Sequence, residues 1–151
     1  CWRTDHDLPA GPDLDPARAG CGLIWHAPLV PMSPADARRF VSLVEGTCAE
    51  YGIEPLVTLT TLSPRCFDST IPLLFDPAEP GAAERARRCQ RALLARGRRE
   101  GFLPYRLDTG AMAEVVDPDL PFWATAGRLK AALDPRGILS PGRYTPRPPP
   151  A

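Results

Sequence analysis

The side chains that most often carry catalysis are few in this chain, and their spacing excludes several kinds of site. The 151 residues include two histidines, His6 and His26, too few to build a metal site from histidine ligands. The five cysteines are odd in number and contain no Cys-x-x-Cys pair, so we expect reduced thiols and neither a zinc site nor a disulfide framework. Motifs for nucleotide phosphates, zinc proteases and serine hydrolases are also absent. Short motifs of common active sites therefore identify no catalytic group.

Composition and charge indicate an ordinary globular protein. Hydrophobic residues make up 44% of the chain and charged residues 24%. Eighteen basic residues balance eighteen acidic ones, so we expect no general attraction to nucleic acid or to membranes. Apolar runs are far shorter than the roughly 20 residues that span a bilayer, and no signal peptide is recognised, which predicts a cytoplasmic protein. The chain begins with cysteine rather than methionine, so we expect that it was cut from a longer one.

Apolar patterns in the first half predict a strand, a helix and a second strand. Residues 23–30 form an apolar run bounded by glycine and proline, as in a buried strand. Ser33 can cap a helix whose apolar residues recur at spacings of three and four until Gly52 ends it. Residues 56–62 are rich in valine, leucine and threonine, which favours a strand.

The second half predicts a further strand, helix, strand and helix. Arg65 and Asp68 are expected in a turn before a strand at 71–75, where Pro72 indicates an edge position or a bulge. An arginine-rich helix then runs as far as Gly101, with most of its arginines facing solvent or a neighbouring domain. A last strand over 102–107 and a helix over 122–133 complete the series.

The predicted fold class is α+β. The order β-α-β-β-α-β is that of a ferredoxin-like antiparallel sheet with both helices on one face, and the C-terminal helix and tail fall outside it. Residues 1–20, rich in aspartate, proline and glycine, are expected to be a connector. Residues 146–151 are expected to be a disordered, proline-rich tail.

Four stretches stand out when taken together and in order: CGLIWHAP at 21–28, SPR at 63–65 with IPLLFD at 71–76, GFLPYR at 101–106, and ALDPRGILSPGR at 132–143. They resemble the C-terminal region of FAD-linked oxidases of the vanillyl-alcohol oxidase and p-cresol methylhydroxylase type. The resemblance covers about residues 20–144. It implies that 21–103 are the closing part of a cap domain and that 104–145 return to an FAD domain. That N-terminal FAD-binding domain would be the missing partner.

The resemblance also implies a phenol site. Tyr105 and Arg106 match a family pair that binds the phenol oxygen of the substrate. A hydroxyl and a guanidinium beside that oxygen stabilise the phenolate, which loses hydride to the flavin more readily than the neutral phenol. Arg143 matches a phenol-binding arginine, and Trp25 matches an aromatic residue that lines the cavity near the flavin. Both are therefore candidates for binding substrate and FAD.

The chain departs from the family pattern at three places. Leu23 stands where vanillyl-alcohol oxidase has its flavin-linking histidine, and Asp15 stands where p-cresol methylhydroxylase has its flavin-linking tyrosine. His26 should project from the face of its strand opposite to that of residues 23 and 25. We therefore expect FAD that is not covalently attached through this segment. Asp68 and Ser69 replace a histidine pair, which argues against a simple phenol as substrate.

Two readings of function remain open on sequence grounds. The leading one is the C-terminal portion of an FAD-dependent oxidoreductase that oxidises a para-substituted phenol or related benzylic alcohol, inactive without its other half. The alternative is a truncated, non-catalytic ferredoxin-like module that serves as an interaction or structural domain, with the edge strand at Pro72 as a contact surface. The family further suggests a homo-oligomer.

Overall fold

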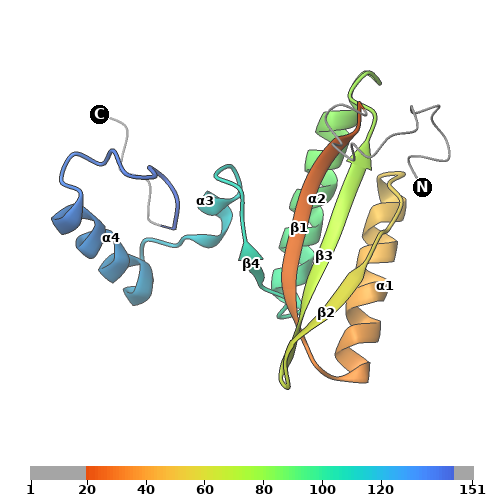
Figure 1. Ribbon diagram of the computed structural model, residues 1–151, viewed down its shortest axis with the longest axis horizontal. Coiled ribbons are helices and arrows are strands. Elements are labelled where there is room, and N and C mark those ends of the chain that lie inside the picture. The colour runs from red at the N-terminus through yellow and green to blue at the C-terminus, as the bar shows by residue number, and fades with distance from the viewer. Residues whose placement is uncertain (1–19, 145–151) are drawn as a thin grey trace, which may run out of the picture. The chain divides into compact units, whose positions relative to one another are not determined.

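The computed structural model describes residues 20–144, which divide into two compact units after Arg106. The predicted tail at 146–151, and all of the predicted connector except Gly20, lie outside the described residues. No helix among residues 20–144 is long and apolar enough to cross a membrane. Figure 1 shows the order of the elements along the chain.

The first unit is the predicted ferredoxin-like sandwich. Its sheet has the order β2-β3-β1-β4, and each neighbouring pair is antiparallel. Both long helices lie behind this sheet in Figure 1, so they cover a single face of it. The element bounds are β1 Gly22–Pro31, α1 Pro34–Glu50, β2 Thr58–Ser63, β3 Cys66–Phe75, α2 Ala82–Arg99 and β4 Pro104–Arg106. The predicted fold class is confirmed.

The core of the first unit lies between the sheet and the two helices. Ser33 caps α1 as predicted, because its hydroxyl oxygen accepts a hydrogen bond from the Asp36 backbone N–H at 3.0 Å. Phe40 of α1 meets Phe102 edge to face, with ring centroids 5.1 Å apart. Residues from β1, β3, α1 and α2 complete the buried cluster, among them Val30, Val44, Ile71, Leu73 and Leu93.

The hairpin of β2 and β3 differs from the prediction. β3 begins at Cys66, where Ser63 is its partner on β2, and the turn shrinks to two residues. Asp68 therefore lies within a strand, opposite Thr60, and the prediction that placed it in a turn was wrong. Pairing with β2 stops at Thr70, so Pro72 is paired only with β1 and occupies a local edge of an inner strand.

The second unit contains a short helix that the sequence did not predict, α3 at Met112–Val115, and the predicted helix, α4 at Pro121–Leu133. Asp134 ends α4 and fixes the next turn. Its carboxylate accepts the backbone N–H groups of Ile138 at 3.1 Å and Leu139 at 2.8 Å, and it pairs with the Lys130 ammonium. These bonds hold the pKa of Asp134 below its usual range, and the bond from Lys130 is the largest cause.

Candidate functional site

Asp68 projects from the face of the sheet opposite the helices. Along β3 its neighbours Phe67 and Ile71 pack into the core, and side chains alternate between faces along a strand. On β1, Ile24 packs against the core while Trp25 is 56% exposed, so Trp25 lies on the same outer face as Asp68. The outer face thus presents a carboxylate and an indole.

Tyr105 joins Asp68 on this face. β4 pairs with β1 through Arg106 opposite Ala27, and an irregularity in register follows there. From β4 the Tyr105 hydroxyl reaches past β1 and donates a hydrogen bond to Oδ2 of Asp68 at 3.1 Å, between residues 37 positions apart. The Arg106 guanidinium carbon lies 5.5 Å from the centre of the Tyr105 ring.

Electrostatics at Tyr105 oppose its ionisation. Burial raises the pKa of the Tyr105 phenol most, and the hydrogen bond to Asp68 and the charge of that carboxylate raise it further, while Arg106 acts in the other direction. Tyr105 is therefore a neutral hydroxyl at physiological pH, and its single proton is directed at Asp68.

The second oxygen of Asp68 is unusual. Oδ1 is buried and has no hydrogen-bond partner among the described residues. An unpaired buried acceptor costs about 1–3 kcal/mol, so such atoms in folded proteins call for a specific reason.

Trp25 and His26 lie on opposite faces of β1, as the strand alternation predicted. Trp25 is two positions before Ala27 in β1, roughly 7 Å along the strand from the residue that pairs with Arg106. His26 is 4% exposed, and burial lowers its pKa to about 4, so its imidazole is neutral at pH 7. The outer face therefore carries Trp25 as well as the Tyr105–Asp68 pair, and His26 lies on the other face.

Arg143 belongs to the second unit. Its side chain is exposed, and its backbone N–H donates to the Ser140 carbonyl at 3.2 Å. No hydrogen bond or ion pair of its guanidinium is formed within residues 20–144. Its predicted part in binding substrate or FAD stays a prediction.

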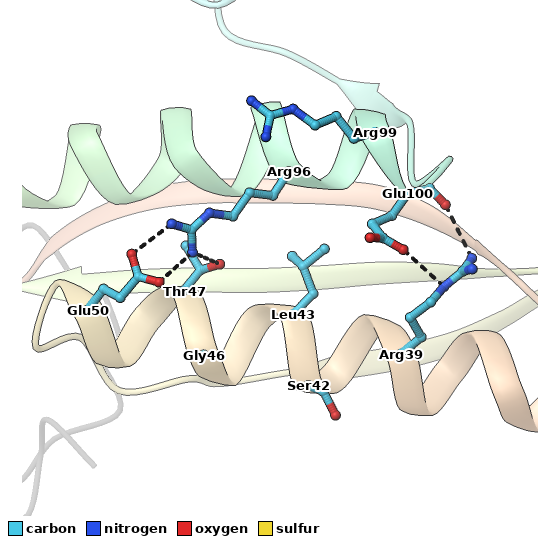
Figure 2. A pocket seen from close by; sticks show the side chains of 9 residues that line it. All are labelled: Arg39, Ser42, Leu43, Gly46, Thr47, Glu50, Arg96, Arg99 and Glu100. Atoms are coloured by element: carbon cyan, nitrogen blue, oxygen red, sulfur yellow. Dashed lines mark hydrogen bonds and ion pairs between the residues drawn. The ribbon is translucent and has the colours of Figure 1, made fainter.

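A groove of about 440 Å³ lies elsewhere, between α1 and α2 (Figure 2). Arg96 crosses it to form two hydrogen bonds of 2.7 Å with the Glu50 carboxylate, and Arg39 lies 3.4 Å from a Glu100 carboxylate oxygen. No aromatic residue lines the groove, and most of its charged side chains are already paired with one another. We assign it no part in the candidate site.

The pairing of Tyr105 with Asp68 is the feature that sequence reasoning missed. The alternation of residues could have indicated it. Phe67, Ser69 and Ile71 lie on the helix-covered face of one strand, which places Asp68 on the other face. A turn was expected there instead, so the carboxylate was not connected with the tyrosine.

Comparison with known proteins identifies relatives of the chain by sequence. No family model matches the chain. Over 143 residues it is 33% identical to 1'-carboxy-chondrochloren decarboxylase of Chondromyces crocatus, a match that covers 95% of the chain and 26% of that protein. It is 28% identical over 127 residues to the 4-cresol dehydrogenase [hydroxylating] flavoprotein subunit of Pseudomonas putida, covering 83% of the chain and 24% of the subunit.

Solved structures of similar fold belong to the same kind of flavoprotein as the second of these relatives. The chain superposes on 4-ethylphenol oxidase from Gulosibacter chungangensis, in its isoeugenol complex, with a TM-score of 0.78 and 25% identity, covering 86% of the chain and 25% of the oxidase. Substrate-bound p-cresol methylhydroxylase gives a TM-score of 0.76 at 26% identity, and the match covers 83% of the chain and 24% of that protein. The chain is homologous to the C-terminal part of p-cresol methylhydroxylase-type flavoproteins. The predicted family is thus confirmed, and the chain spans about a quarter of the length of these relatives.

Proposed function

We propose that the chain is the C-terminal portion of an FAD-dependent oxidoreductase that oxidises a para-substituted phenol or a related benzylic alcohol by hydride transfer to flavin. The observation that carries the proposal is the polar group on the outer sheet face, where Tyr105 and Arg106 lie together. The names of relatives support it, because 4-cresol, which is the same compound as p-cresol, and 4-ethylphenol are para-substituted phenols.

FAD would supply the hydride acceptor. Two side chains present here suit such a cofactor: the exposed indole of Trp25, which can lie against a flavin ring, and the exposed guanidinium of Arg143, which can pair with an anionic oxygen of cofactor or substrate. Leu23 and Asp15, at the positions of the family's covalent anchors, cannot form a histidyl or tyrosyl link, so we propose that this segment holds FAD without a covalent bond.

Tyr105 and Arg106 would act on the phenol oxygen. Hydride loss from the benzylic carbon is easier when the phenol oxygen carries negative charge. A guanidinium and a hydroxyl donor stabilise that charge most strongly where water is excluded. Tyr105 is partly buried in this chain, whereas Arg106 is exposed.

We further propose that residues 21–103 are the closing part of a cap domain and that 104–145 return to the FAD domain. The second unit supports this division of roles. α4 has no buried residue, and Phe122, Leu129 and Leu133 on its apolar side are 70%, 61% and 82% exposed. Such a side is suited to packing against the remaining three quarters of a flavoprotein of the relatives' length.

The test is the variant Tyr105→Phe in the full-length flavoprotein. Removing one donor from a charge-stabilising site lowers turnover by about 10²–10³-fold, and we expect a loss of this size with a para-substituted phenol. Tyr51→Phe is the matched control, because it removes a hydroxyl at the end of α1, on the helix side of the sheet. Unchanged turnover in Tyr105→Phe would remove the assignment. The chain alone is expected to be inactive.

A further inference from the structure

Two cysteines face each other between the long helices, and the proposed function uses neither of them. Cys48 lies near the end of α1 and Cys89 in the first half of α2, and both are free thiols that are 0% exposed. We propose that Cys48 and Cys89 are a modification site, at which a peroxide converts the two thiols into a disulfide bond that joins α1 to α2. This inference goes beyond the proposed function and does not depend on it.

The contact between the two side chains is the first argument. The thiols are hydrogen-bonded to each other although they belong to different helices. Both lie in the same buried cluster, where Ala86 of α2 is one turn before Cys89 and has a side chain small enough to let the helices approach. A disulfide bond holds its sulfur atoms about 2.0 Å apart, and thiols already in contact reach that separation by a small movement.

The hydrogen bond also makes the two thiols unequal. It lowers the pKa of Cys48, against the effect of burial, and it raises the pKa of Cys89 together with burial. Cys48 is therefore the thiol that ionises first, and the thiolate is the form that attacks an oxidant. Cys89 keeps its proton and faces the sulfur that is oxidised.

The reaction balances with hydrogen peroxide as the oxidant. The Cys48 sulfur attacks one peroxide oxygen, the O–O bond breaks, and a sulfenic acid and one water molecule form. The Cys89 sulfur then attacks the Cys48 sulfur. The S–S bond forms, the S–O bond breaks, and the hydroxyl leaves as water with the Cys89 proton. Two thiols are oxidised, one peroxide is reduced to two water molecules, and a dithiol reductant reverses the change.

The other two cysteines in the described part of the chain are placed differently. Gly22, next to Cys21, is opposite Phe75, whereas Cys66 is opposite Pro31, roughly 30 Å away along the paired strands. A disulfide bond spans at most about 7 Å between Cα atoms, so these two cannot join each other. Both are partly exposed, which makes them reference thiols for the buried pair.

The test is a disulfide map of the 151-residue chain after incubation with hydrogen peroxide and alkylation of the remaining thiols. Trypsin cleaves after arginine and lysine, so each of the five cysteines lies in a peptide of its own. We expect the peptide of Cys48 to be joined to that of Cys89, and the joined peptide to disappear after reduction with dithiothreitol. Cys89→Ala should abolish the joined peptide, whereas Cys66→Ala, the matched control, should retain it in full.

Urea denaturation of the same samples measures the effect on the fold. Oxidation of the wild type should raise the equilibrium constant for folding about 10²-fold, because the bond closes a long loop of the unfolded chain. In Cys89→Ala, peroxide should leave this constant unchanged.

Three results would overturn the proposal. The first is a wild-type map without the joined peptide, which needs no variant to interpret. The second is Cys48 joined to Cys21 or Cys66 in the same yield as to Cys89. The third is a joined peptide together with a lower folding constant, which would mean that the bond forms only in the unfolded chain.

Discussion

The two units of the chain use their apolar residues in opposite ways. In the first unit, Phe40, Val44 and Leu93 are at most 1% exposed and fill a core between sheet and helices. In the second, α4 is amphipathic as predicted, yet Phe122 and Leu133 are mostly exposed. The first unit is therefore stabilised by its own packing. The second is ordered by local bonds, such as those of Asp134, and the apolar side of α4 has no buried residue.

The largest expected effect is on the free energy of unfolding, and it distinguishes the packed core of the first unit from the exposed side of α4. Phe40→Ala should lower the free energy of unfolding of the first unit by about 3–5 kcal/mol, because it opens a cavity between α1 and Phe102. Phe122→Ala, the same change on α4, should alter it by less than about 0.5 kcal/mol. Urea denaturation followed by circular dichroism measures both. Equal losses would show that α4 already has a packed core in this chain.

A smaller effect concerns pH and the first unit alone. Burial lowers the pKa of His26 from 6.5 to about 4, so between these values the unfolded chain binds a proton that the folded chain does not. The free energy of unfolding should therefore fall as the pH is lowered from 6.5 towards 4, by up to about 3 kcal/mol from this residue. His26→Phe should show a shallower fall in denaturation series at pH 7 and pH 4.5. Parallel falls in both proteins would contradict the assignment.

The smallest effect on the chain itself is expected on the exposed side of α4. Leu129→Glu should leave its unfolding free energy within about 0.5 kcal/mol, since the side chain is already in water. In the full-length protein the same change should weaken flavin retention, because a charge would be buried against the FAD domain. Arg128→Glu, on a neighbouring polar position, is the control. Full retention in Leu129→Glu would argue that the apolar side of α4 stays exposed.

Local rules predicted most of the fold. The cap at Ser33, the apolar stripe of α1 and the end of α4 at Asp134 follow from residues close together in sequence, and the structure contains all three. The start of β3 was missed because the short Pro64-Arg65 turn carries a weaker signal than the proline inside the strand. Asp68 then seemed to belong to a loop.

The candidate site was predicted only in part. Trp25, Tyr105 and Arg106 were named from a resemblance, and Trp25 and Tyr105 lie on one face of the sheet. The contact between Tyr105 and Asp68 depends on which strands are neighbours and in what register, a property of the whole sheet. Arg143 belongs to the second unit, so its role depends on the longer protein and stays a prediction.

β4 has only three residues, yet it carries the tyrosine and closes the sheet beside the first strand. Its pairing joins the two ends of the first unit, and such distant contacts are slow to form because a long loop must close. A chain that ends at Leu103 would retain every residue of the buried cluster and both long helices, but would lack Tyr105. The residue that completes the site therefore lies outside the set of residues that forms the core.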